Sequence, residues 1–295
     1  MARKTARDFD PNILKLFDGY VHGEMSKRDF LRGAGKYVAA GVTATAVLES
    51  LQPNYALAEQ VAPDDPSIET MRVTYDSPDG HGPITGLMAK PAGVTEPLPA
   101  VLVIHENRGL NPYIEDVVRR IAKAGYLAFG PDGLSPLGGY PGNDDDGRDM
   151  QRSLDGTKLL QDFFAAYEFL TTHDGSTGKT GAVGFCYGGG VCNALAVAYP
   201  DMAASVPFYG RQAAAEDVPA IQAPLLLHYG ELDERINAGW PDYEAALIAN
   251  DKRFEAHFYA GAPHGFHNDT TPRYDPEAAE LAWERTLAHF AANLT

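Results

Sequence analysis

The sequence has few cysteines, a shortage of basic residues and no long apolar run, and each absence narrows the class of protein. Its 295 residues include only two cysteines, Cys186 and Cys192, which are too few for a disulfide scaffold. On one helix they would point to different faces, so we expect no bridge between them. The formal net charge of −16 argues against a nucleic-acid partner and against an anionic membrane surface. No run of eighteen uncharged apolar residues occurs, so we expect no membrane span.

The chain also lacks internal repeats, low-complexity segments and clusters of metal ligands at a convincing spacing. We therefore expect no metal ion, and we interpret the run Asp144-Asp145-Asp146 as a solvated face of a loop. What is present is enough length for one large α/β domain, with 44% apolar and 22% charged residues. An acidic total does not exclude a locally basic pocket, so a small anionic substrate stays among the alternatives.

The first sixty residues differ in composition from the rest and allow two interpretations. A basic cluster at residues 26–32 precedes a mildly apolar stretch at residues 37–48, and Ala56-Leu57-Ala58 has the small residues of a cleavage site. This order resembles a twin-arginine signal, with Lys27 in place of the first arginine. Such a signal would deliver the protein to the periplasm, which we favour over a cytoplasmic location.

The alternative is that residues 1–60 form a helical arm that stays on the protein. Asp10-Pro11 is a helix start, and Ser26 is a suitable N-cap for a second helix. An arm of this kind would pack on the domain or on a neighbouring subunit, and in the second case it would support a homo-oligomer. Residues 62–66 are rich in proline and aspartate and are typical of a linker.

Strands and helices alternate over residues 61–295, which predicts one α/β domain. Its sheet should be mainly parallel, doubly wound and flanked by helices, after an opening antiparallel hairpin. The glycine-rich and proline-rich stretch at residues 134–147 is expected to be a long loop at the mouth of a site. Expected strands cover residues 69–75, 84–89, 100–105, 126–129, 204–209, 223–229 and 254–259, and expected helices cover residues 113–124, 148–172, 237–250 and 276–293.

The most informative motif is a Gly-x-Cys-x-Gly turn, which lies between an apolar strand and a helix of small residues. It matches the nucleophile elbow of an α/β-hydrolase, with the Cys186 thiol where serine usually stands. Gly184 and Gly188 lack the Cβ atoms that would collide in so sharp a turn. Cys186 is thereby expected at the crest of the turn, at the carboxyl end of the sheet.

A thiol nucleophile needs a base, and the base needs an orienting acid. In α/β-hydrolases the chain order is nucleophile, acid, base, and each residue follows a strand. Asp233, after the strand at residues 223–229, is the acid candidate, and His264, after the strand at residues 254–259, is the base candidate. Other histidines lie within or at the ends of strands, or away from the loop apex, and are poorer candidates: His105, His228, His257 and His267.

The loop after the first central strand should supply a second donor for an oxyanion, beside the backbone N–H of Tyr187. The backbone N–H of Asn107 is the candidate. Glu106, in the same loop, would keep Cys186 protonated until substrate displaces the carboxylate. The alternative for Glu106 is a salt bridge with Arg108 that braces the loop.

On these residues the chain resembles the dienelactone hydrolase (carboxymethylenebutenolidase) family from about residue 68 to the C-terminus. The motifs that carry the resemblance are His105-Glu106-Asn107-Arg108-Gly109, Pro131-Asp132, Gly184-Phe185-Cys186-Tyr187-Gly188-Gly189, Gly230-x-x-Asp233 and His264-Gly265-Phe266.

The resemblance implies a Cys-His-Asp triad at Cys186, His264 and Asp233, with Glu106 gating the thiol. It also implies the hydrolysis of enol-lactones or related small-molecule esters without a cofactor. The sequence departs from the family at Asn107-Arg108, where an apolar pair is usual. The family holds a substrate carboxylate with arginines, and the candidates here are Arg108, Arg148, Arg152 and Arg273.

Two other classes of function remain open from the sequence. A redox or thiol-transfer role for Cys186 would need a resolving cysteine, and Cys192 is badly placed for it. A non-catalytic binding or assembly protein would keep the fold and use its arm to join subunits. The ordered set of nucleophile, acid and base favours the hydrolase.

Overall fold

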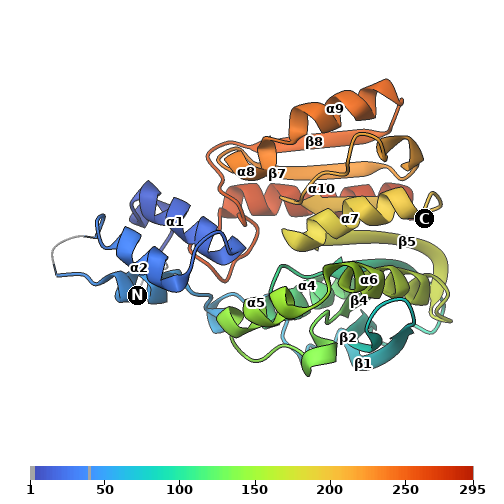
Figure 1. Ribbon diagram of the computed structural model, residues 1–295. Helices are drawn as coiled ribbons and strands as arrows, with labels where there is room; N and C mark the ends of the chain where they lie inside the picture. The colour runs from blue at the N-terminus through green and yellow to red at the C-terminus, as the bar shows by residue number, and fades with distance from the viewer. Residues whose placement is uncertain (1–3, 39–40, 295) are drawn as a thin grey trace.

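An eight-stranded sheet forms the centre of the computed structural model, which describes residues 4–38 and 41–294 (Figure 1). Its order is β1-β2-β4-β3-β5-β6-β7-β8. The β1–β2 hairpin is antiparallel and joins β4 in antiparallel fashion, whereas all later pairs are parallel. The strands are β1 (Ile68–Ser77), β2 (Gly82–Pro91), β3 (Leu98–Ile104), β4 (Leu127–Pro131), β5 (Ser176–Phe185), β6 (Ala204–Phe208), β7 (Leu225–Gly230) and β8 (Phe254–Tyr259).

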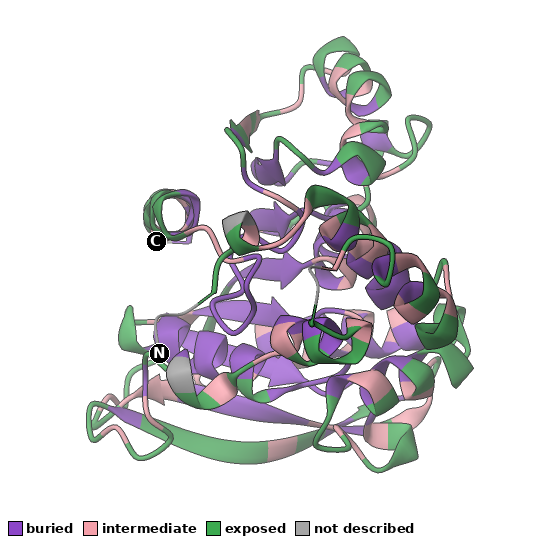
Figure 2. Cartoon of the chain, turned by 90° about the vertical axis from the view of Figure 1, so that its left-hand side faces the viewer, coloured by how far each residue is buried: buried purple, intermediate pink, exposed green. Residues whose placement is uncertain are grey.

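Helices cover both faces of the sheet, because successive strand residues point to opposite sides. In β3, Val101 and Val103 pack with α4 (Pro112–Lys123) and α10 (Pro276–Asn293) on one face. Leu102 and Ile104 pack on the other face, with α6 (Gly156–Thr171), α7 (Tyr187–Ala198) and α9 (Trp240–Ala249). Figure 2 shows the buried strands in the middle of the molecule and exposed residues on the outer sides of the helices. The predicted mainly parallel α/β-hydrolase architecture is confirmed.

One predicted helix is broken in two, and another begins three residues later than expected. The expected helix at residues 148–172 is α5 (Asp144–Ser153) followed by α6, because the Asp155 side chain accepts from the Thr157 and Lys158 N–H groups and so starts a new helix. The expected helix at residues 237–250 is α9, which begins at Trp240, just before Pro241, because the short helix α8 (Glu234–Asn237) occupies the preceding residues.

The interpretation of Asp144 as part of a solvated loop was wrong. Asp144 opens α5 and is buried, where its carboxylate accepts from Arg108 Nη1 at 2.7 Å and from Tyr55 Oη at 2.5 Å. A carboxylate in the first turn of a helix is stabilised by the helix dipole. The last four residues of the expected mouth loop, 144–147, are therefore helical.

The N-terminal arm contains three α-helices that lie beyond the carboxyl ends of the parallel strands (Figure 1). They are α1 (Pro11–His22), α2 (Lys27–Ala34) and α3 (Ala44–Leu51), and residues 39 and 40 of the predicted apolar stretch lie outside the described residues. Asp10 and Ser26 cap α1 and α2 as expected. Within the described part of the chain, no helix has both the length and the apolar character needed to cross a membrane.

The arm has its own apolar core, which is separate from the two cores of the sheet. Its buried members all come from α1, α2 and α3 and are Ile13, Phe17, Tyr20, Val21, Phe30, Ala34, Val47, Leu48 and Leu51. The segment that follows returns to the main domain, where Tyr55 and Val61 pack against the α4 face of the sheet. The arm therefore folds around itself and then docks on the domain of the same chain.

Candidate active site

The turn between β5 and α7 is a strained elbow centred on Cys186. Its φ of 54° and ψ of −110° lie in a region that residues with a Cβ rarely adopt. A Cβ on Gly184 would lie 2.1 Å from the Gly188 carbonyl oxygen, and a Cβ on Gly188 would lie 2.3 Å from the Ile104 carbonyl oxygen. Both glycines are therefore required for β3, β5 and α7 to approach so closely. The elbow directs the half-buried Cys186 side chain toward the end of the sheet.

The structure brings His264 and Asp233 together at the same end of the sheet. His264 Nδ1 lies 2.5 Å from Asp233 Oδ2, and both side chains are buried. The other carboxylate oxygen, Asp233 Oδ1, accepts from the Ile236 N–H at 3.2 Å and caps α8. This arrangement fixes the carboxylate and places the Nδ1–H of His264 on it, so that Nε2 of the ring faces the thiol.

The nearby imidazoles change the acidity of the Cys186 thiol. Burial raises its pKa, but the His264 and His22 rings outweigh burial and lower the pKa to about 5. Burial lowers the pKa of His264, but the Cys186 and Asp233 charges raise it to about 10. The two shifts belong to one coupled pair, and both favour a thiolate beside an imidazolium. Cys192, in contrast, is a buried free thiol whose pKa is raised by desolvation.

The residues expected to stabilise an oxyanion lie at the start of α7 and in the turn after β3. Tyr187 is the first residue of α7, and the first N–H groups of a helix have no acceptor within the helix. Asn107 lies in the turn after β3, and its side-chain Nδ2 donates to the Val21 carbonyl oxygen at 2.7 Å. The arm thus holds the loop that carries the second candidate donor.

Glu106 is buried, and its contacts brace its own loop. Its Oε2 accepts from Asn268 Nδ2 at 3.0 Å and lies 3.7 Å from Arg108 Nε. This ion pair is the alternative that the sequence left open. Gating of the Cys186 thiol by Glu106 stays a prediction.

The arginines considered for substrate binding are engaged in ion pairs. Arg108 is paired with Asp144, and Arg148 is paired with Asp145 and stacks 4.9 Å from the centre of the Tyr20 ring. Arg273 Nη1 lies 3.3 Å from Asp18 Oδ1, and its guanidinium lies 5.4 Å from the Phe17 ring centre. Arg152, which is half-exposed, pairs with Asp149 at 3.1 Å. Arg148 and Arg273 thus hold the arm, and substrate binding by Arg108, Arg148 or Arg273 stays a prediction.

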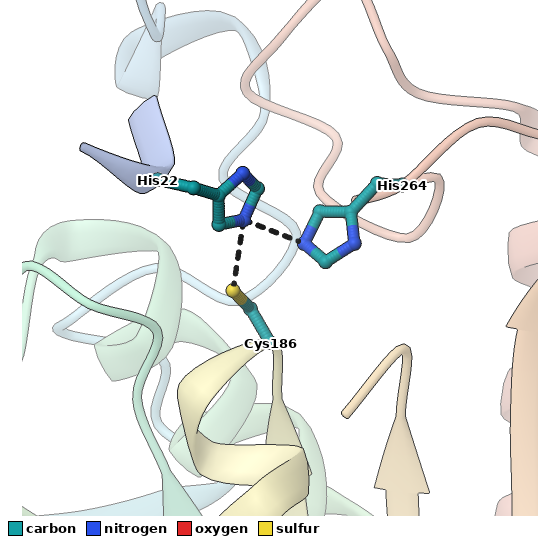
Figure 3. Close-up of side chains that lie close together, drawn as sticks. All are labelled: His22, Cys186 and His264. Atoms are coloured by element: carbon teal, nitrogen blue, oxygen red, sulfur yellow. Dashed lines mark hydrogen bonds between the residues drawn. The ribbon is translucent and has the colours of Figure 1, made fainter. Parts of the chain in front are cut away.

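One residue of the site, His22, was missed by sequence reasoning. It is the last residue of α1, and its Nε2 lies 3.4 Å from Cys186 Sγ and 3.2 Å from His264 Nε2 (Figure 3). Its Nδ1 lies 2.8 Å from the Asp18 carbonyl oxygen and 3.3 Å from Asp18 Oδ1. The only local signal is the Asp18–His22 pair, four residues apart on one helical face, and such pairs are common on surfaces.

A parallel sheet with a strained nucleophile elbow at its carboxyl edge, followed along the chain by an acid and a histidine, defines an α/β-hydrolase. Comparison with known proteins narrows this class. The model of the dienelactone hydrolase family matches residues 84–294, so the chain belongs to the dienelactone hydrolase family and is a hydrolase. The resemblance noted from the sequence is confirmed. A second model, described as YqhI-like, matches residues 1–39 of the arm.

Individual proteins agree with this assignment. The chain is 60% identical over 116 residues to "Putative hydrolase fragment YghX" of Escherichia coli, which covers 39% of this chain and 99% of the relative. It is 33% identical to "Probable 2-oxo-3-(5-oxofuran-2-ylidene)propanoate lactonase" of Bradyrhizobium, over 70% of this chain and 88% of the relative. Among solved structures, "Putative Dienelactone Hydrolase" of Klebsiella pneumoniae is similar with a TM-score of 0.66 and 26% identity, over 76% of this chain and 99% of that chain.

Proposed function

We propose that this chain hydrolyses a carboxylic ester or enol-lactone of a small molecule through a thioester on Cys186. The observation that carries the proposal is the meeting of three side chains at one point. Cys186 stands on the strained elbow, His264 faces it, and Asp233 holds the far side of the His264 ring at 2.5 Å. The lactonase named among the relatives supports a lactone as the substrate.

The first half of the reaction forms the thioester. The Cys186 thiolate attacks the carbonyl carbon, and the N–H groups of Asn107 and Tyr187 stabilise the resulting oxyanion by roughly 3 kcal/mol each. The C–O bond then breaks, and the His264 imidazolium gives its proton to the departing enolate or alkoxide. An enolate suits a thiol enzyme, because a poorer leaving group would be expelled more slowly than the thiolate itself.

The second half regenerates the enzyme. His264, now neutral, takes a proton from a water molecule that attacks the thioester carbonyl. The C–S bond then breaks, and the acid product leaves. The proton taken from water stays on His264, so the thiolate–imidazolium pair is restored. Asp233 holds the Nδ1–H tautomer of His264 in both halves. Apart from the attacking water molecule, each of these steps uses groups of this chain alone.

Substitution of the nucleophile tests the proposal. Cys186→Ala should lower kcat/KM on an aryl ester or an enol-lactone by at least about 10³-fold. Cys192→Ala is the matched control, since Cys192 is buried and should keep normal turnover if the variant folds. Mass spectrometry of a His264→Ala variant after mixing with an aryl ester should find one acyl group on Cys186. Full activity in Cys186→Ala would refute the mechanism.

A redox role for Cys186 would need a second accessible thiol. Cys192 has no exposed surface, and desolvation raises its pKa, so it is a poor resolving cysteine. Peroxide treatment followed by thiol titration should therefore leave Cys192 unreacted and show no Cys186–Cys192 bridge.

A further inference from the structure

We propose that Cys186, His22 and His264 bind one divalent transition-metal ion, Zn²⁺ or a cation of similar softness, and that the bound ion arrests hydrolysis while it ties the arm to the domain. The arrest rests on the proposed function, whereas the binding of the ion does not. The three side chains come from α1, the elbow before α7 and the loop after β8, and they point toward one another (Figure 3).

The spacing of the donor atoms fits a tetrahedral metal site. His22 Nε2 lies 3.2 Å from His264 Nε2 and 3.4 Å from Cys186 Sγ, and the donor atoms of all three lie within 4.8 Å of one another. With Zn–N bonds of about 2.0–2.1 Å and a Zn–S bond of about 2.3 Å, tetrahedral ligands would lie about 3.4 Å apart for two nitrogens and about 3.6 Å apart for nitrogen and sulfur. The two separations from His22 Nε2 are already close to these values, and the remaining pair, Cys186 and His264, lies within 4.8 Å. Three protein ligands leave a fourth position for water.

Both histidines are held in the way that metal-bound histidines are held. His264 Nδ1 donates to the Asp233 carboxylate at 2.5 Å, and His22 Nδ1 donates to the Asp18 carbonyl oxygen at 2.8 Å, with the Asp18 carboxylate at 3.3 Å. A carboxylate or carbonyl on the far nitrogen fixes the tautomer and raises the basicity of the metal-binding nitrogen. A cation would displace the Nε2 proton of the His264 imidazolium, and the two Nε2 atoms, 3.2 Å apart, would then both offer lone pairs to it.

The donor set selects the kind of metal. A thiolate with two imidazoles suits Zn²⁺ and comparable transition metals, whereas Mg²⁺ and Ca²⁺ prefer oxygen ligands. The carboxylates of Asp18, Asp233 and Glu24 add negative charge around the site. The sequence predicted no metal, because His22 and Cys186 are 164 residues apart and share no ligand motif.

One cation of the protein competes for the same nitrogen. Arg235 Nη2 lies 3.0 Å from His22 Nε2, and Arg235 Nε lies 3.8 Å from Asp18 Oδ2 and 3.9 Å from Glu24 Oε1. Its side chain is exposed, so it can turn toward solvent when an ion takes its place. Arg235 therefore weakens metal binding, and its removal should strengthen it.

Metal titration of the reduced, chelator-treated full chain tests the proposal. Competition with a chromophoric zinc chelator should give one Zn²⁺ per chain, and Co²⁺ should give the thiolate-to-cobalt absorption band and the strong visible bands of a four-coordinate site. His22→Ala should weaken Zn²⁺ binding by at least about 100-fold, and Asp18→Asn should weaken it by about 10–100-fold. Arg235→Gln should tighten it, and His257→Asn, on the far strand β8, should leave it unchanged.

The outcomes separate this proposal from the hydrolase mechanism. Equal Zn²⁺ affinity in the natural chain, His22→Ala and Asp18→Asn would overturn the three-ligand site and leave only an ion on the Cys186–His264 pair. If the site exists, Zn²⁺ should inhibit ester hydrolysis with the affinity found by chelator competition, and EDTA should restore the rate. Metal binding without inhibition would overturn the arrest alone. If instead Cys186→Ala hydrolyses esters normally, the mechanism fails while the metal titration still stands.

Discussion

At the scale of single residues, the reactivity of Cys186 depends on the two imidazoles beside it. Because these rings lower its thiol pKa to about 5, the thiolate should predominate from about pH 6 upward. Alkylation by iodoacetamide should therefore reach half of its maximal rate near pH 5, instead of near the ordinary thiol pKa of about 8.5. His22→Ala removes one of the two stabilising rings, so its midpoint should move to higher pH. A Cys192→Ala background restricts the reaction to Cys186, and a midpoint near pH 8.5 in that background would contradict the assigned ion pair.

Asp233 combines an electrostatic role with a structural one, and two substitutions separate them. Asn is as good an N-cap as Asp, so Asp233→Asn should keep the bond from the Ile236 N–H and the start of α8. It removes the charge that helps to raise the pKa of His264. We expect kcat/KM to fall by about 10²–10⁴-fold with little change in thermal unfolding. Asp233→Ala should lose both activity and stability, and an Asn variant with the natural rate would contradict the role of the carboxylate.

At this scale, the sequence predicted those site residues that directly follow the end of a strand. Cys186, Asp233 and His264 each follow an apolar run, and parallel strands bring such residues to one edge of the sheet. His22 belongs to a helix whose docking depends on contacts with distant residues. One of these contacts joins Asn107 Nδ2 to the Val21 carbonyl oxygen, 86 positions apart in the chain. No local period or spacing encodes such a contact, so neither His22 nor Asp18 could be assigned from the sequence.

At the scale of elements, the elbow ties β3, β5 and α7 together through glycine. Gly188→Ala would place a Cβ 2.3 Å from the Ile104 carbonyl oxygen, and backbone on both sides prevents relief. We expect the free energy of unfolding to fall by about 1–3 kcal/mol or more, together with a loss of activity. Gly190→Ala, on the same helix, is the control, because its nearest contact is Arg211 Cβ at 3.6 Å. Alanine there should be neutral or stabilising by about 0.5–1 kcal/mol in urea unfolding. Equal stability of the two variants would contradict the close approach at Gly188.

The elements themselves were predicted with uneven success, for physical reasons. Continuous apolar runs such as that of β3 are required for a strand that is buried on both faces, so the parallel strands were placed to within a few residues. Helix boundaries failed where a cap or a tertiary partner decided them. Asp155 divides a continuous helical pattern, and the acidic start of α5 is helical because Asp144 finds Arg108 and Tyr55 in the folded chain.

At the scale of the whole molecule, the arm and the domain have separate apolar cores and a mainly polar interface. Lys15 pairs with Glu234, Lys27 with Asp145 and Asp18 with Arg273, while the apolar core of the arm draws its members from within residues 9–51. These ion pairs join the arm to the domain of its own chain, so the docking does not need a second subunit. Export by cleavage after residue 58 and assembly through the arm stay predictions. Cleavage there would remove His22 from the site. The intact mass of the protein isolated from its host would show whether this cleavage occurs.

This division of cores predicts that the arm can undock without unfolding. Salt should weaken the ion pairs of the interface, since the Debye length falls to about 3 Å at 1 M, whereas apolar cores are not weakened by added NaCl. Hydrogen exchange at the amides of residues 18–22, next to the interface, should therefore be faster in 1 M NaCl than in 0.05 M NaCl, while the amides of β3 and β5 should keep their protection.

Arg273→Gln removes the buried partner of Asp18 and should cause the same faster exchange at low salt. In both cases iodoacetamide should reach Cys186 faster, because α1 covers the thiol with His22. Faster exchange in the arm and in the sheet together would contradict two cores, because it would mean that the whole chain unfolds as one unit.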